Sequence, residues 1–324
     1  MSKKSKRRES IKSSILILLL IAILLIASTY AWFTANTVVS VSTLDVHVEA
    51  QNGLQISVDG TNWKTVLTAE DITGANATYT SSVNQLPGEM EPVSTVGTVT
   101  DGVMEMFYGT VSGDDSGSYL LTATQETDAR GTEGKYIVFD AFFRVDRDSA
   151  LSLTKDSKVT AKAGTTSRGL ENAARVGFCV LGNTTSTDLS TIQGLTGGTT
   201  SYIWEPNYDV HTAEGVKNAK DTYGIETSVT GGSKLEYYGV NQAISSGVAL
   251  KSTETYFTKV TPKISTTASY STDNALMNLT AGITKVRIYM WIEGQDVDCE
   301  NSASGVDISY TLQFSIPTST STGD

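Results

Sequence analysis

The sequence predicts an all-β fold, and we expect a β-sandwich with long insertions. Several short stretches alternate apolar and polar side chains, as half-buried strands do. Ser, Thr, Gly, Val and Tyr dominate the composition, and only five prolines occur in the 324 residues. This usage favours strands joined by Gly- and Ser-rich turns. Strands near both ends of the chain indicate one sandwich domain, which we place at residues 44–316.

Residues 1–31 have the layout of a secretory signal peptide. Six basic residues and one acidic residue precede an uncharged apolar run of 13 residues, Ile15–Ala27, and Thr29-x-Ala31 offers a small-residue cleavage site. The alternative is a retained membrane anchor, since the stretch through Phe33 approaches the roughly 20 residues that span a bilayer. In either case the basic head predicts that the chain after Ala31 is exported.

The charge of the exported part excludes two classes of partner. The whole chain has a net charge of −11, and removal of the basic head leaves −16. Nucleic-acid binding needs a basic surface that displaces counterions, so we expect none. An acidic surface also disfavours docking onto an anionic bilayer. We therefore expect membrane contact only through the N-terminal segment before its cleavage.

The predicted strands follow one another along the chain. Residues 43–50 alternate apolar and polar side chains from Leu44 onward. Residues 53–66 repeat the pattern and turn at Asp59-Gly60, which is a strong hairpin signal. The later strands are expected, with the last two forming a pair, at residues 135–146, 151–161, 174–182, 285–294 and 306–316.

Two looser stretches lie between these strands, near residues 65–134 and 183–281, and both are rich in Gly, Thr, Ser and Asp. We interpret them as insertions in the sandwich, made of long loops or small subdomains. Residues 317–324 are expected to form a flexible C-terminal tail.

The junction between the apolar segment and the first strand resembles that of a known family. Residues 29–50, TYAWFTANTVVSVSTLDVHVEA, place a small-aromatic-small segment ahead of a strand that begins Ser-Thr-Leu-Asp-Val. This arrangement is similar to the export junction of the TasA/camelysin family of bacterial surface and biofilm-matrix proteins. The match covers about a tenth of the chain. The segments FDAFFRVD, IWEPN and IYMWIEGQDVDCEN also look like parts of TasA-like secreted proteins from Gram-positive bacteria.

The resemblance implies a jelly-roll sandwich, secreted to the cell surface or the extracellular matrix, that assembles into fibres. In family members the segment freed by signal removal serves as a donor strand that completes the sheet of the next subunit. In this chain the corresponding donor arm is residues 32–43, and its assembly residues are Trp32, Phe33, Val39 and Val41.

The arm itself has the features that such a strand needs. It is extended, β-branched and uncharged up to Asp45, as a strand added to a foreign sheet edge should be. Val39 and Val41 cannot share a face with Leu44 in one regular strand, so we expect a bulge or break near Ser42-Thr43. We expect signal peptidase to cut within Ala31-Trp32-Phe33.

Other functions have less support in the sequence. The alternative to a fibre subunit is a non-polymerising surface adhesin, or a module whose inserted loops bind a glycan or a protein. Camelysin-like proteins have been described as metalloproteases, but the chain holds only His47 and His211 and no H-E-x-x-H motif. No G-x-S-x-G elbow occurs either. We therefore expect a structural protein, not an enzyme, without a cofactor and with a second copy of itself as its main partner.

Two further features allow two interpretations each. Asp296, Asp298 and Glu300 alternate in GQDVDCEN, so they are candidate calcium ligands or else part of a solvated turn between strands. Cys179 and Cys299 are an even pair in an exported chain, so they are either bridged or two buried thiols.

Overall fold

The computed structural model describes residues 39–48, 54–113, 119–217, 238–249, 255–299, 303 and 305–317. Over these residues the chain forms several sheets and only short helices, which confirms the predicted all-β class. None of the helices in this part of the chain is long and apolar enough to cross a bilayer.

The first sheet contains seven strands. In sheet order they are β19 (Asn274–Leu279), β11 (Ser149–Leu153), β21 (Ile308–Ser315), β1 (Val39–Val48) and β3 (Val66–Thr68); β12 (Lys158–Ala161) pairs with β21, and β4 (Glu89–Met90) pairs with β1. Strand β1 runs parallel to β21 and antiparallel to β3 and β4. The first and last strands of the described chain therefore lie side by side in the middle of this sheet.

The second sheet contains six strands. In sheet order they are β18 (Lys263–Ile264), β14 (Thr200–Glu205), β13 (Ala174–Thr184), β20 (Gly282–Ile292), β10 (Ile137–Val145) and β2 (Gln55–Ser57). Every residue of β20 after Gly282 is buried, so both faces of this central strand are covered.

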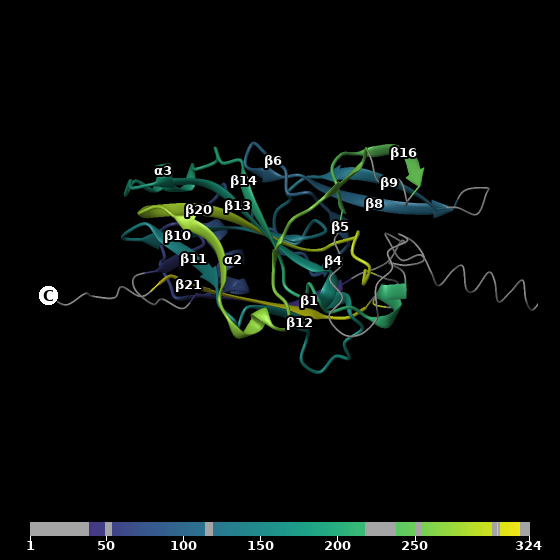
Figure 1. The fold of residues 1–324 in the computed structure, drawn as a ribbon. Helices are drawn as coiled ribbons and strands as arrows, with labels where there is room; N and C mark the ends of the chain where they lie inside the picture. Colours follow the sequence, from purple (N-terminus) through teal and green to yellow (C-terminus); the bar gives the residue numbers. More distant parts are fainter. Residues whose placement is uncertain are drawn as a thin grey trace, which may run out of the picture.

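The main core lies between the two sheets, which form two layers in Figure 1, with β10, β13 and β20 in one layer and β1, β11 and β21 in the other. Val286 of β20 and Leu312 of β21 belong to this core. Phe314 packs edge-to-face against Phe143 and Phe178, with ring centroids 5.2 and 6.0 Å apart. Such aromatic contacts add to the burial of apolar area, so they help to hold the two layers together.

The predicted pairing of the last two strands is wrong. Strand β20 lies in the six-stranded sheet and β21 lies in the seven-stranded sheet, so the chain between them crosses from one layer to the other. Both strands bury an alternating set of apolar side chains in the same core. Two strands that face each other across a core satisfy this alternation as well as two neighbours in one sheet, so the pattern does not distinguish the two arrangements.

The two stretches interpreted as insertions contain many short strands, and some of these strands join the main sheets. Residues 65–134 supply β3 and β4, and residues 183–281 supply β14, β18 and β19. The additional elements are α2 (Ala69–Gly74), η1 (Ala75–Ala77), β5 (Val93–Ser94), β6 (Val99–Thr100), β7 (Val103–Met104), β8 (Met106–Gly113), β9 (Tyr119–Glu126), α3 (Leu189–Gln193), β15 (Tyr238–Val240), β16 (Ile244–Ala249), β17 (Phe257–Lys259) and η3 (Ser269–Ser271), besides η2 (Leu170–Ala173), which precedes β13.

These additional strands form smaller sheets beside the sandwich. Strands β16, β9, β8 and β5 make a four-stranded sheet, while β15 pairs with β17 and β6 pairs with β7. In Figure 1 the β8–β9 hairpin extends away from the two main layers. The outer face of the six-stranded sheet is covered in part by this inserted material, where Met104 packs in one cluster with Tyr289 and Trp291 of β20.

Two cations of β20 are also buried on this outer face. Arg287 Nε lies 2.8 Å from Asp140 Oδ1 of β10, and Lys285 Nζ lies 3.3 Å from Asp140 Oδ2. The Tyr79 hydroxyl donates to Asp140 at 2.8 Å and accepts from Lys285 at 2.7 Å. Burial opposes ionisation of Asp140, but the charges of Arg287 and Lys285 hold its pKa below the usual value. The network therefore fixes the inserted segment that carries Tyr79 onto the sheet.

The predicted turn at Asp59-Gly60 is confirmed. Ile56 and Lys64 exchange two backbone hydrogen bonds, of 3.1 and 2.8 Å, on either side of it. Gly60 has a φ of 75°, a left-handed value that glycine adopts without steric cost.

Several predictions fall outside the described residues. These are the signal peptide at 1–31, the processing site at Ala31, Trp32 and Phe33, the first part of the donor arm, the calcium candidate Glu300 and the tail from residue 318 onward.

We predict that Asp140→Asn lowers the free energy of unfolding by about 3–5 kcal/mol, because it leaves Lys285 buried without its counter-charge and leaves Arg287 with Asp128 alone, at 3.5 Å. Urea denaturation followed by fluorescence measures this change. Asp156→Asn is the matched control, because Asp156 is exposed, and we expect it to change stability by less than about 0.5 kcal/mol. Equal effects of the two substitutions would contradict the role of the network.

The same carboxylate predicts a pH dependence. The pKa of Asp140 lies below its ordinary value of 3.8 in the folded protein, so its ionised form stabilises the fold above about pH 4 and this contribution is lost as the pH falls through the folded value. We expect the free energy of unfolding to fall more steeply below pH 4 in the wild type than in Asp140→Asn. Parallel slopes in urea titrations at several pH values would contradict this.

Candidate functional site

Strand β1 contains the described part of the predicted donor arm. Val39 and Ser40 pair with β4, and Val41 pairs with Ile308 of β21. Residues 39–43 therefore belong to the chain's own sheet, whereas we expected the arm to lie outside it as far as residue 43. The physical reason is that an extended segment needs partners for its backbone N–H and C=O groups, and β4 and β21 supply them within the same chain.

The predicted bulge near Ser42-Thr43 is confirmed, because the register of β1 on β21 shifts between Val41 and Thr43. The bulge divides β1 into two pieces. The leading piece, residues 39–41, pairs with β4 and touches β21 only at Val41, while the following residues pair with β21 up to Val48 and also with β3.

A cluster of charged side chains lies at one end of the six-stranded sheet, and we call it the carboxylate cluster. Its members are Arg175, Glu205, His211, Glu293, Asp296 and Asp298. The antiparallel register explains why they meet, since Ala174 pairs with Ile292 and Val176 pairs with Trp204. This register brings the start of β13 next to the ends of β14 and β20 and to the loops that follow them.

Short hydrogen bonds join the members of the cluster. Arg175 Nη2 lies 2.5 Å from both Glu205 Oε1 and Asp296 Oδ2. His211 Nδ1 lies 2.7 Å from Asp298 Oδ2, while Asp298 Oδ1 accepts from the backbone N–H and the hydroxyl of Thr212, both at 2.8 Å. Glu293 accepts from the Trp291 indole N–H at 3.0 Å and is fully buried.

The cluster perturbs the acidity of its members. Burial raises the pKa of Glu205 to about 7, and Arg175 only partly offsets this. Burial also raises the pKa of Glu293 to about 7. Burial acts to lower the pKa of His211, but the hydrogen bond to Asp298 and the negative charges of Asp296 and Asp298 raise it above its ordinary value. The site thus holds more acidic groups than its cations neutralise.

The structure changes the interpretation of the acidic loop. Asp296 and Asp298 are buried and are 4 % and 1 % exposed, so they do not form the solvated turn that we gave as one alternative. The sequence did not identify Glu205 or His211 as their neighbours. Glu205 lies in a segment with turn chemistry, and His211 is 87 residues before Asp298, so only the strand register brings them together.

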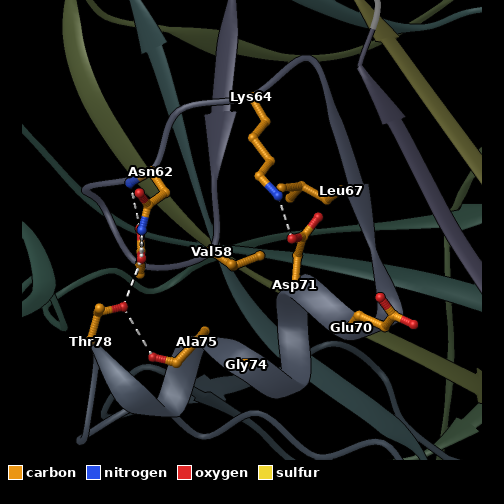
Figure 2. A pocket seen from close by; sticks show the side chains of 10 residues that line it. Val58, Asn62, Lys64, Leu67, Glu70, Asp71, Gly74, Ala75 and Thr78 are labelled. Carbon is orange, nitrogen blue, oxygen red and sulfur yellow. Dashed lines mark hydrogen bonds and ion pairs between the residues drawn. The ribbon is translucent and has the colours of Figure 1, made fainter.

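A separate pocket of about 340 Å³ lies between the Asp59-Gly60 turn and α2 (Figure 2). The Lys64 ammonium and the Asp71 carboxylate form an ion pair of 2.5 Å across it. Asp59 accepts hydrogen bonds from the backbone of Asn62 and the hydroxyl of Thr78, and these bonds hold its pKa far below the ordinary value against the effect of burial. The carboxylates of Asp59 and Asp71 already have partners among the residues that line the pocket, which indicates a structural role.

The two cysteines lie in different parts of the core. Cys179 belongs to the cluster on the outer face of the six-stranded sheet, and Cys299 belongs to the main core between the sheets. No disulfide joins them, so of the two alternatives from the sequence the structure has the buried thiols. Burial raises the pKa of the Cys179 thiol to about 12.

Comparison of the chain with protein-family models, with curated proteins and with solved structures returned no match.

We predict that both thiols resist modification in the folded protein and react after unfolding. The thiolate is the reactive form, and burial keeps Cys179 protonated at pH 8. Labelling with iodoacetamide should modify neither cysteine in the native protein and both in guanidinium chloride without a reductant. Unfolded protein that is labelled only after a reductant is added would show that the two residues are bridged.

Proposed function

We propose that the protein is an exported structural subunit that assembles into fibres by exchanging its N-terminal strand between copies. The observation that carries the proposal is the position of β1. It lies in the middle of the seven-stranded sheet, parallel to β21, yet no tight hairpin connects it to β21, β3 or β4. A strand that is held only by hydrogen bonds and packing can be replaced by the same strand of another copy.

Exchange of this kind preserves the contacts. The incoming strand finds the same edges of β4 and β21, so the free energy of pairing is similar within and between chains. If each copy gives its strand to the next copy, the contact is heterologous and does not close, which produces a filament. The bulge between Val41 and Thr43 offers the place where the leading piece, residues 39–41, separates from the rest of β1.

The sequence resemblance supports the same proposal, because fibre formation by a donor strand is what the TasA/camelysin-like junction implies. Val39, Ser40 and Val41 are uncharged, as a segment buried in a neighbour should be. An adhesin is the second candidate, and the observation that favours it is the β8–β9 hairpin, which extends from the sandwich in Figure 1. An adhesin should function as a monomer.

The test uses a disulfide to link the leading piece, residues 39–41, covalently to β4 of its own chain. Ser40 pairs with Glu89, and Glu89 is exposed, so the double variant Ser40→Cys and Glu89→Cys can form a disulfide within the sheet. We expect the oxidised protein, starting after Ala31, to remain monomeric and the reduced protein to form fibres in negative-stain electron microscopy. The control pair, Thr110→Cys and Thr122→Cys in the β8–β9 hairpin, should assemble in both states.

A second measurement tests the exchange directly. Fibres of the Ser40→Cys and Glu89→Cys variant are grown under reducing conditions and then oxidised. Exchange predicts disulfides between copies and hence a ladder of covalent multimers in denaturing gels. Monomeric bands alone, or normal fibres from the locked protein, would refute strand exchange, and a wild type that never assembles would favour the adhesin.

A further inference from the structure

The carboxylate cluster contains more acidic groups than its cations can balance. Four buried carboxylates, those of Glu205, Glu293, Asp296 and Asp298, face one guanidinium and one imidazole. A buried carboxylate is stable as an anion only where a cation or several hydrogen-bond donors compensate its charge, and otherwise it takes up a proton. The partners of each side chain indicate which of the four favour a proton.

The two aspartates have a partner at every oxygen. Asp296 accepts from Arg175 Nη2 at 2.5 Å on one oxygen and from the Asp298 N–H at 2.8 Å on the other. Asp298 accepts twice from Thr212 on Oδ1, and its Oδ2 lies 2.7 Å from His211 Nδ1. Neither aspartate is therefore left with a bare oxygen inside the protein.

The two glutamates are less well compensated. Glu205 Oε1 accepts from Arg175 at 2.5 Å, but Oε2 is buried and has no partner within the described part of the chain. Glu293 is fully buried and accepts from neutral groups, the Trp291 indole and the Gln295 N–H, both at 3.0 Å. An anion on either side chain would lie inside the protein without full compensation, so both glutamates favour a bound proton.

The acidities agree with this geometry. Burial raises the pKa of Glu205 and of Glu293 from 4.5 to about 7. Burial acts to lower the pKa of His211, but Asp298 and Asp296 raise it above 6.5. All three groups bind protons more readily in the folded than in the unfolded chain. The stability that the glutamates contribute is therefore complete below about pH 4.5 and is lost as the pH rises through about 7.

The cluster also joins two loops. His211 and Thr212 lie in the segment that follows β14, and Asp298 lies in the loop that follows β20. The His211 ring, the Thr212 N–H and the Thr212 hydroxyl all contact Asp298. The two segments are close together, since a Cβ at Gly215 would lie 2.3 Å from Asp298 Oδ1. A change of charge in the cluster therefore acts directly on the contacts between the loops.

The charges that face the two glutamates belong to Arg175, His211, Asp296 and Asp298. Other elements that pack here contribute neutral groups, namely Val93 and Ser94 of β5, the Asn172 carbonyl of η2, Ser265 after β18 and the Tyr310 hydroxyl of β21. The neighbouring charged residues have partners outside the cluster, and these are Glu171 with Ser167, Asp209 with Thr267, Glu214 with Lys217 and Lys263 with the Tyr202 ring.

We propose that the carboxylate cluster is a pH-dependent latch, which holds the segment after β14 to the loop after β20 in mildly acidic solution and releases it as the pH rises. With protons on Glu205 and Glu293 and a charged His211, two anions and two cations remain. Near pH 8 these protons are lost, and four anions face the single charge of Arg175. Their repulsion weakens the contacts of Thr212 and His211 with Asp298, so the two loops separate more often.

Hydrogen exchange at single amides, followed by NMR, measures the latch in the wild-type protein. The Thr212 N–H donates to Asp298 Oδ1 and the Asp298 N–H donates to Asp296 Oδ1, both at 2.8 Å. After correction for the intrinsic exchange rate at each pH, we expect the protection of these amides to be about tenfold lower at pH 8 than at pH 5. The Lys64 amide, which donates to Ile56 at the Asp59-Gly60 turn, should be protected equally at both pH values.

Glutamine variants distinguish a latch controlled by protons from an ordinary ion pair. Glutamine has the shape of a protonated glutamate and cannot ionise, so the double variant Glu205→Gln and Glu293→Gln should keep the protection of the Thr212 amide at pH 8. Loss of an ordinary ion pair would lower this protection at both pH values. The matched control is Glu214→Gln, which removes an exposed carboxylate from the same segment and should keep the wild-type pH dependence.

The His211 ring provides a separate readout. Its NMR resonance, assigned by comparison with His47→Ala, should titrate with a midpoint above 6.5, and Asp298→Asn should lower that midpoint. Circular dichroism at both pH values checks that each variant is folded, while the wild-type measurements need no variant to fold.

Two results would overturn the proposal. The first is a Thr212 amide in the wild type that is protected equally at pH 5 and pH 8. The second is a folded double glutamine variant whose protection falls with pH as steeply as that of the wild type. Neither result depends on fibre formation, so the latch and the proposed function are tested separately.

Discussion

The burial of β20 on both of its faces is the constraint on which the rest of the structure depends. One face supplies Val286 and its alternate neighbours to the core between the sheets. The other face carries Lys285 and Arg287, which cannot be left inside the protein without negative partners. An ordinary sandwich would leave this face in water. Here the inserted segments cover part of it, and Asp140 on the neighbouring strand, together with Asp128 of the first inserted stretch, balances the two cations. The insertions are therefore a third layer that the charges of the central strand require.

The seven-stranded sheet depends on a different constraint. Its middle position is occupied by β1, and within the described residues no tight hairpin joins β1 to β21, β3 or β4. A sheet that is completed by such a strand has unsatisfied edges on β21, β3 and β4 whenever the strand is absent. The chain can satisfy these edges by itself or with a second copy. The leading piece before the bulge pairs with β4 at two residues and with β21 only at Val41, so it is the part in which the two arrangements compete.

The sequence predicted the fold class and most of the long strands, because alternation and turn chemistry are local signals. The Asp59-Gly60 dipeptide predicts its turn from local sequence alone. Val41 and Leu44 are an odd number of residues apart, so they cannot share a face of one regular strand, and this spacing predicted the bulge. The pairing of β20 with β21 was predicted wrongly because strands across a core carry the same alternation as strands in one sheet. The carboxylate cluster was predicted in part. Asp296 and Asp298 are close in sequence, whereas Glu205 and His211 join them only through the register of β13 with β14 and β20.

The two buried ionic networks differ in the balance of their charges. On the outer face, Asp128 and Asp140 meet Lys285 and Arg287, so two negative charges face two positive charges and the network is closed. In the carboxylate cluster, four acidic groups face Arg175 and His211, so the acidic side chains outnumber the basic ones by two even when the imidazole is charged. The raised pKa values of Glu205 and Glu293, both about 7, show how unfavourable the fully ionised state is. Glu205 Oε2 and His211 Nε2 also lack hydrogen-bond partners within the described part of the chain, so the hydrogen bonds of this cluster are less complete than those of the outer network.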